Sequence, residues 1–169
     1  MQIGADKTQV STVTFSSGVD NQFPLNQYTN KVDLDKAIMS IPFKGGQTHT
    51  AEGIRYVTSN SFSPVNGARY DVPHVLVVVT NGQSGTLDLT KLAAQTARDN
   101  GVIIYSVGVG AGVDMAELQA MATDPDSRHL FTAQNYDALS SLSDLMSTKI
   151  CNGKIIKELE VSIKCFKLI

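Results

Sequence analysis

Uninterrupted apolar runs mark two buried strands in the second half of the chain. Residues 75–79 are VLVVV, and residues 102–110 are VIIYSVGVG. Such runs are typical of strands that are buried on both faces, as in parallel sheets. Thr80 and Asn81 directly follow the first run. Because ligands of open α/β sheets bind just beyond the carboxyl ends of the strands, this pattern predicts a site at residues 80–84.

The remaining pattern alternates between strands and helices. Residues 8–16 alternate in polarity and predict a strand, and Pro24 suits an edge strand in the segment that follows. One helix is predicted over 88–99, a second begins at Asp114 and a third begins at Asn135. In the third, apolar residues at helical spacing continue to Ile150. A short strand at 129–133 separates the last two. This order predicts an α/β fold with a doubly wound, mostly parallel sheet flanked by helices on both faces.

Polar residues predict where the helices start and end. Asp33 is expected to cap a short helix, and Thr50 to cap a helix that begins at about residue 51. Asp114 and Glu117 fit a capping box. Asn100-Gly101 ends the helix over 88–99. That helix is expected to face inward with Leu92, Ala93, Thr96 and Ala97.

Composition narrows the class of partner. The 169 residues carry a formal net charge of −2, with 42% hydrophobic and 18% charged residues. This charge gives no reason to expect nucleic acid or an anionic membrane as a partner. The longest apolar stretch is too short for membrane insertion. The N-terminal residues MQIGADKTQV lack the basic and apolar regions of a signal peptide.

Motifs for catalysis are absent from the sequence. The stretch GVGAG at 108–112 lacks the full dinucleotide-binding pattern and a phosphate-binding lysine. No serine stands in a nucleophile elbow. His74 and His129 have no cysteine or carboxylate near them at metal-ligand spacing. We therefore expect a protein that is not an enzyme and has no catalytic residues.

Several stretches, taken in order, resemble the von Willebrand factor A (VWA) domain of extracellular-matrix proteins such as matrilins and type VI collagen. The resemblance covers about residues 5–151 and rests on TQVSTVTFSSGVDNQFPLNQY, IPFKGGQTHTAEGIRYV, VPHVLVVVTNGQS, GVIIYSVGVG, LQAMATDPDSRHLFTAQNYDAL and LMSTKIC. It implies a Rossmann-like sheet whose top face holds Mg²⁺ in a metal-ion-dependent adhesion site. The family builds that site from an Asp-x-Ser-x-Ser loop, a threonine and an aspartate.

The resemblance maps two of these positions onto the chain. Thr48 matches the family's threonine, and Asn81 stands where the family has aspartate, whereas the Asp-x-Ser-x-Ser loop has no counterpart. Asparagine supplies a neutral oxygen to a site that prefers carboxylates, so we expect a degenerate site, no metal and no cofactor. Two plainer interpretations stay open. Thr48 caps the following helix, or Asn81 forms a turn in which its pairing with Gly82 needs positive φ.

The resemblance also implies a gap in the sheet. The family's first strand lies between the strands at 8–16 and 75–80, and this sequence has no counterpart of that strand or of the first helix. The chain is then an N-terminally truncated piece of a larger protein, an incomplete gene model, or a domain that fills the gap differently. Residues 1–151 form the VWA-like domain. The tail, 152–169, is either a strand, which could enter the gap, or an extension.

The family's disulfide bears on the cysteines. In the matrix members, a cysteine after the last helix pairs with one before the first strand, which would leave Cys151 without that partner. Pairing with Cys165, or a reduced thiol, are the alternatives.

By resemblance, we expect an extracellular, non-enzymatic adhesion or scaffold module that binds matrix proteins such as collagens, with self-association as a further expectation. The alternatives are a non-functional fragment and a nucleotide-dependent enzyme. The expected top face consists of the loops 16–20, 45–50, 81–86 and 110–114, and its ligand-binding residues are Thr48, His49, Asn81, Gln83 and Ser84.

Overall fold

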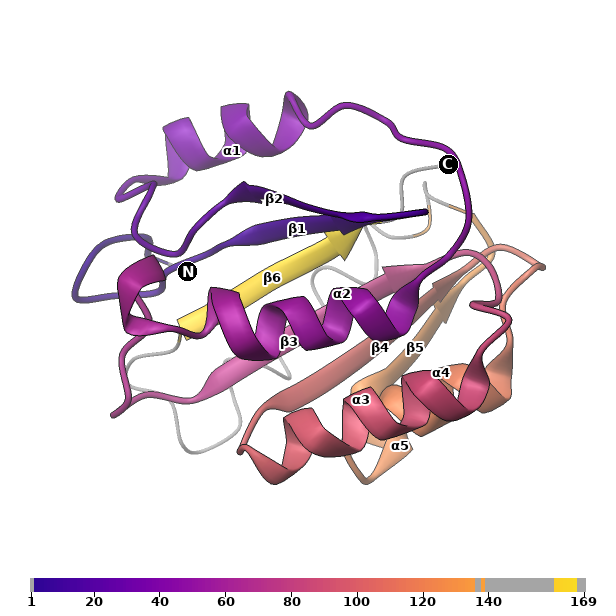
Figure 1. The fold of residues 1–169 in the computed structure, drawn as a ribbon. Helices are drawn as coiled ribbons and strands as arrows, with labels where there is room; N and C mark the ends of the chain where they lie inside the picture. Colours follow the sequence, from indigo (N-terminus) through magenta and orange to yellow (C-terminus); the bar gives the residue numbers. More distant parts are fainter. Residues whose placement is uncertain (1, 136–137, 139–159, 167–169) are drawn as a thin grey trace.

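A single mixed sheet forms the centre of the molecule (Figure 1). The computed structural model describes residues 2–135, 138 and 160–166. Within them the sheet has the order β2-β1-β6-β3-β4-β5. Only β2 runs antiparallel to its neighbour. This confirms the predicted doubly wound α/β class. The strands are β1 (Thr12–Phe15), β2 (Val19–Phe23), β3 (His74–Thr80), β4 (Ile103–Val109), β5 (Leu130–Ala133) and β6 (Glu160–Phe166).

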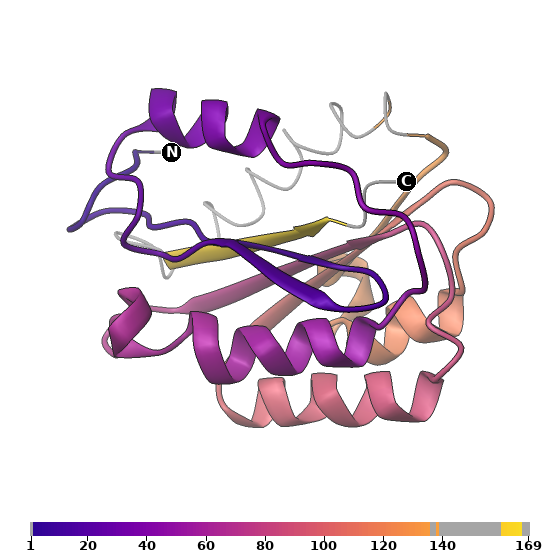
Figure 2. The same cartoon turned by 45° about the horizontal axis from the view of Figure 1, so that its top comes forward.

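Helices lie on both sides of this sheet. Figure 2 shows α1 on one side and α2 and α3 on the other. The bounds are α1 (Lys31–Met39), α2 (Thr50–Tyr56), α3 (Leu87–Asp99), α4 (Met115–Met121) and α5 (Asp126–His129). Asn135 accepts a hydrogen bond from the Ala138 N–H (3.0 Å), as a helix cap does. The rest of the helix predicted there, 139–150, lies outside the described residues. No helix in the described part is long and apolar enough to cross a membrane.

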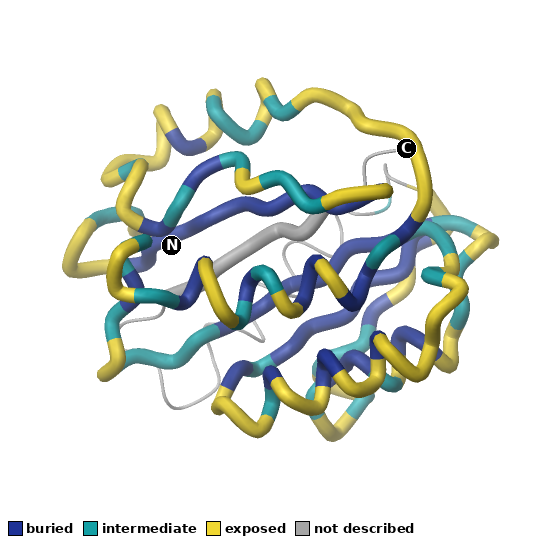
Figure 3. Tube along the Cα trace, viewed as in Figure 1, coloured by how far each residue is buried: buried dark blue, intermediate teal, exposed yellow. Residues whose placement is uncertain are grey.

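Strands β3 and β4 are buried on both faces, as their apolar runs predict (Figure 3). Because side chains alternate along a strand, each strand supplies two cores. Leu76, Val78 and Ile104 pack with the buried residues of α2, α3 and α4. Val75 and Tyr105 belong to a second cluster, which also contains Phe131 of β5. The runs at 75–79 and 102–110 are therefore correctly interpreted as central parallel strands.

The tail strand occupies the gap that the family resemblance implies. Strand β6 lies between β1 and β3 and runs parallel to both. Its register with β3 joins His74 to Glu160 and Val79 to Phe166, with an irregularity between Val75 and Val77. Of the alternatives left open for the tail, the structure has the strand.

Two helix caps differ from prediction. Asn30, not Asp33, caps α1, since the Asn30 side chain accepts a hydrogen bond from the Asp33 backbone N–H (3.0 Å). His49, not Thr50, holds the cap position of α2, and no side chain caps that helix. Thr50 is already helical and its hydroxyl is buried without a described partner. The Asp33 prediction lies three positions too late, because Asn30 and Asp33 are both suitable capping residues. The Thr50 prediction lies one position too late.

The face of α3 and the first strand are also corrected. Leu92 is 59% exposed and Thr96 is exposed as well, whereas Thr90 and Ala94 are buried along with Ala93 and Ala97. The small side chains let α3 approach α2 and α4 closely, and this leaves the bulky leucine outside. Strand β1 covers only Thr12–Phe15 of the predicted 8–16, because β2 pairs with no more than this part.

Candidate functional site at the top face

The four predicted loops do meet at the carboxyl ends of the parallel strands. The Gln47 backbone N–H donates to Ser17 Oγ (3.0 Å). A Cβ added to Gly82 would lie 3.8 Å from Thr48 Oγ1, and one added to Gly112 would lie 3.1 Å from the backbone oxygen of Asn81. Loop 45–50 therefore touches both 16–20 and 81–86, and 110–114 touches 81–86. The top face is one continuous surface.

Thr48 and His49 are fixed by the backbone next to them. The His49 backbone N–H donates to the carbonyl oxygen of Ser16 (3.0 Å), which ties this loop to the end of β1. Thr48 is 6% exposed, while the His49 side chain is partly exposed. His49 Nε2 lies 2.8 Å from Gln47 Oε1, and Nδ1 lies 4.0 Å from Glu52 Oε2. His49 is thus held at the surface by polar neighbours.

Asn81 has a buried acceptor that nothing in the described chain uses. Its Oδ1 is buried and accepts no hydrogen bond from a described residue. The turn itself is built by Thr80, whose hydroxyl donates to the Gly82 carbonyl oxygen (3.2 Å) and accepts from the Gly82 N–H (3.4 Å). Gly82 does not adopt positive φ; Gly85 does, at 68°. The prediction of a turn with positive φ at Asn81-Gly82 is therefore wrong. A buried unpaired oxygen costs free energy unless a ligand satisfies it.

Gln83 and Ser84 face different surroundings. Gln83 is exposed at the loop tip. Ser84 instead anchors the loop: its N–H donates to Glu117 Oε2 (2.9 Å), and its hydroxyl lies 3.2 Å from Thr90 Oγ1. The Thr90 hydroxyl donates to Glu117 Oε1 (2.9 Å). We therefore assign Ser84 to positioning the loop rather than to contacting a ligand.

Glu117 is the residue whose role the sequence did not reveal. Glu117 is 3% exposed, and its carboxylate joins the 81–86 loop to α3. Asp114 does cap α4, accepting from the Ala116 N–H (2.8 Å) and the Glu117 N–H (3.4 Å). Because the side chain of Glu117 is committed to Ser84 and Thr90, it does not close a capping box. The spacing of Asp114 and Glu117 predicted a local capping box, whereas Glu117 makes a contact with residues distant in sequence.

The donor set at the top face does not fit a hard metal ion. The family position on β3 supplies a neutral amide oxygen from Asn81, and Thr48 supplies a hydroxyl. Two carboxylates near this face are already engaged: Glu117 binds the loop, and Asp20 pairs with Lys44 (2.8 Å). No group of three or more histidine, cysteine, aspartate or glutamate residues within the described part could hold a metal. Mg²⁺ prefers carboxylate oxygens, so these residues offer it little.

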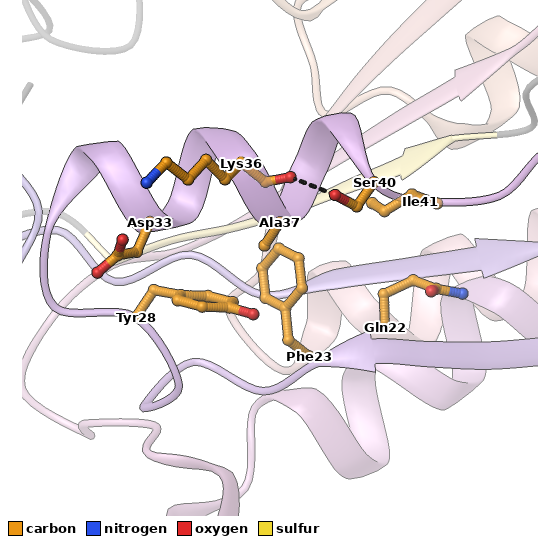
Figure 4. Close-up of a pocket in the computed structure, with 8 residues that line it drawn as sticks. All are labelled: Gln22, Phe23, Tyr28, Asp33, Lys36, Ala37, Ser40 and Ile41. Atoms are coloured by element: carbon orange, nitrogen blue, oxygen red, sulfur yellow. Dashed lines mark hydrogen bonds between the residues drawn. The ribbon is translucent and has the colours of Figure 1, made fainter.

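A separate hollow lies between α1 and β2 (Figure 4). Its volume is about 440 Å³, and Phe23 and Tyr28 meet in it edge to face, 5.0 Å between ring centroids. None of the predicted site residues lines it. The lining residues are Gln22, Phe23, Tyr28, Asp33, Lys36, Ala37, Ser40 and Ile41.

Comparison with known proteins agrees with this architecture. The family model for the von Willebrand factor type A domain matches residues 1–145. Matrilin-1 of Gallus gallus is 34% identical over 151 residues, which are 89% of this chain and 30% of matrilin-1. The collagen alpha-4(VI) chain of Mus musculus is 34% identical over 152 residues, 90% of this chain and 6% of the collagen. The chain thus spans less than a third of these relatives.

Solved structures show the same fold. Proximal thread matrix protein 1 from the mussel byssus matches with a TM-score of 0.79 and 32% identity, over 85% of this chain and 36% of that one. A second structure of that protein, at 29% identity and a TM-score of 0.79 over 89% of this chain and 36% of its own, has a metal site occupied by zinc. With the family model covering most of the residues, the chain belongs to the von Willebrand factor type A domain family and is similar to the domains of matrix matrilins and collagens.

Proposed function

We propose that this chain is a non-enzymatic, extracellular adhesion module that binds matrix proteins such as collagens through its top face, without a metal ion. The observation that carries the proposal is the meeting of the four loops in one continuous surface, bordered by partly exposed His49 and exposed Gln83. The similarity to matrilins and collagens supports the matrix setting and the extracellular location.

The chemistry of the top face favours a ligand that donates hydrogen bonds. In a metal site, a cation links protein oxygens to an acidic group of the partner. Here the top face has neutral side-chain oxygens, of which that of exposed Gln83 is accessible, so the matching group is an N–H, from an arginine, a lysine or the backbone of an extended segment. Partly exposed His49 and exposed Gln83 border this position and can form the polar rim.

Solid-phase binding to immobilised collagens and other matrix proteins tests the proposal. We expect binding that is unchanged by EDTA and that Asn81→Ala weakens about tenfold, the equivalent of roughly 1.4 kcal/mol. Gln95→Ala, an exposed position on α3, serves as the control and should bind normally. Binding that EDTA abolishes, or that Asn81→Ala and Gln95→Ala affect equally, would contradict the metal-free top-face site.

A further inference from the structure

Asparagine is followed by glycine at four places in the chain, 66–67, 81–82, 100–101 and 152–153, and the structure describes the first three. In such a pair the backbone nitrogen of glycine can attack the side-chain Cγ of asparagine, because glycine has no Cβ to obstruct the approach. The attack requires that the asparagine side chain turns and that the glycine N–H leaves its hydrogen bond. The surroundings of each pair therefore decide whether it reacts in the folded chain.

The pair Asn66-Gly67 is held at both residues. Asn66 Nδ2 donates to the carbonyl oxygen of Asn60 (2.8 Å), and the Gly67 N–H donates to the carbonyl oxygen of Pro64 (3.0 Å). Gly67 also adopts the left-handed conformation, with φ at 92°. Two hydrogen bonds of ordinary length must break before this pair can react.

The pair Asn100-Gly101 is held in the same way at the end of α3. Asn100 Nδ2 donates to the carbonyl oxygen of Thr96 (2.8 Å), and the Gly101 N–H donates to the carbonyl oxygen of Arg98 (2.8 Å). The φ of Gly101 is 79°. Because these bonds close the last turn of the helix, the reaction would also unwind the end of α3.

The pair Asn81-Gly82, on the top face, lacks this restraint. Asn81 Oδ1 accepts no hydrogen bond from a described residue, so the side chain loses no bond at that atom when it turns. The Gly82 N–H donates only to Thr80 Oγ1, at 3.4 Å, which is longer than the usual range of an N–H···O bond. Its two neighbours in the comparison each hold their glycine N–H at 3.0 Å or less.

Water has access to the reacting pair. Asn81 and Gly82 are half-buried, and Gln83, which follows them, is exposed. The position is thus close enough to the surface for water to enter and for ammonia to leave. Of the three described pairs, 81–82 combines the weakest hydrogen bonding with contact to solvent.

We propose that Asn81 is a site of spontaneous deamidation. The Gly82 nitrogen bonds to Asn81 Cγ, the Cγ–Nδ2 bond breaks, and Nδ2 leaves as ammonia with the proton from Gly82. Water then opens the resulting cyclic imide at one of its two C–N bonds to the Gly82 nitrogen. Breaking the bond to Cγ gives aspartate, and breaking the bond to the backbone carbon gives isoaspartate. Nothing is oxidised or reduced.

Either product changes the charge of the top face. A carboxylate replaces a neutral amide, which adds one negative charge to a chain with a formal net charge of −2. The top face then attracts cationic groups more strongly and repels acidic ones as the molecule ages. The inference concerns covalent modification and does not rest on the identity of the proposed ligand.

Peptide mapping of the unsubstituted full chain tests the proposal. The folded chain is incubated at neutral pH, digested under mildly acidic conditions and analysed by mass spectrometry for the mass gain that accompanies replacement of NH₂ by OH. A parallel sample is incubated in concentrated urea, where the folded surroundings of all three pairs are lost. Asn66 and Asn100 are the internal controls in both samples.

We expect Asn81 to deamidate at least fivefold faster than Asn66 and Asn100 in the folded chain, and all three at comparable rates in urea. An Asn81 that stays unmodified, or reacts no faster than the two controls in the folded chain, would overturn the proposal. The same preference for Asn81 in urea would show that the local sequence sets it, and would overturn the structural basis.

A second measurement identifies the attacking atom. Gly82→Ala places a Cβ beside the Gly82 nitrogen; this Cβ would lie 3.8 Å from Thr48 Oγ1, an ordinary contact, and the φ of Gly82 is outside the left-handed region. Gly18→Ala, in the loop 16–20, is the matched control, since its Cβ would meet nothing within 4 Å. Isoelectric focusing follows the acidic product in both variants.

We expect Gly82→Ala to slow the appearance of the acidic product at residue 81 at least fivefold, and Gly18→Ala to leave its rate unchanged. Peptide mapping of the acidic band assigns the product to residue 81. Equal rates in the two variants would contradict attack by the Gly82 nitrogen.

Discussion

Strand β3 has two parallel neighbours that are held in different ways. Strand β4 follows it closely in sequence, through α3, and pairs with it without interruption. Strand β6 comes from beyond β5 and pairs with an irregularity. The first joint is a local βαβ unit, and the second closes a long loop. Long-range pairings gain their contacts only after the entropy of loop closure has been lost.

Side-chain hydrogen bonds reinforce the β4 side further. The Ser106 hydroxyl donates to the Leu118 carbonyl oxygen (2.8 Å), and the Ile104 N–H donates to Thr123 Oγ1 (2.9 Å). Arg98 of α3 donates to the carbonyl oxygens of Ala120 (2.9 Å) and Met121 (2.8 Å) at the end of α4. The difference teaches that one sheet can combine neighbours joined by a local βαβ unit with neighbours that come from distant parts of the sequence.

The largest effect is expected from proline in the two neighbours of β3. Val107→Pro removes a ladder N–H from β4 and should cost about 3 kcal/mol or more, enough to abolish a cooperative transition. Lys164→Pro in β6 should cost clearly less and leave β3 and β4 amides protected. Urea denaturation with amide hydrogen exchange measures both. Equal losses would remove the distinction between the joints.

The buried carboxylate of Glu117 should be the next most sensitive position. Glu117→Ala leaves the Ser84 N–H and the Thr90 hydroxyl without their acceptor, and we expect a loss of about 1–3 kcal/mol in unfolding free energy. Asp71→Ala, at an exposed carboxylate, should stay within about 0.5 kcal/mol. Denaturant unfolding compares them. If the two variants behave alike, the Glu117 contacts do not brace the β4 side.

The cap of α4 should contribute less. Asp114→Ala removes the acceptor for the Ala116 N–H, and we expect a loss of about 1 kcal/mol, or about 2–4 °C in Tm. Asp114→Asn keeps a capping oxygen and should retain most of the stability. Thermal melts of the two variants measure this difference in stability. A full loss in Asp114→Asn would show that charge, rather than the hydrogen bond, stabilises the helix start.

The smallest expected effect concerns Mg²⁺. An ion held between Thr48 and Asn81 would tie the loop before α2 to the end of β3 and so stabilise the fold. Because these residues supply only neutral oxygens, we expect melts in Mg²⁺ and in EDTA to coincide within about 1 °C. A clear rise in Tm with Mg²⁺ would show that the top face binds metal after all.

Much of this architecture follows from the sequence, because it depends on local spacing. The apolar runs at 75–79 and 102–110 predict buried strands without any knowledge of their neighbours in the fold. Gly101 ends α3 with φ at 79°, and Asp114 caps α4. The meeting of Thr48 with the 81–82 turn also follows, since carboxyl ends of parallel strands share one edge of a sheet.

Tertiary structure decided what depends on partners distant in sequence. Only packing shows that Glu117 serves the loop at Ser84, that the small residues of α3 face inward while Leu92 stays outside, and that β6 enters between β1 and β3. The mixed composition of the β6 sequence EVSIKCF does not by itself predict a central position in the sheet. It takes that place because two buried strand edges would otherwise lack hydrogen-bond partners.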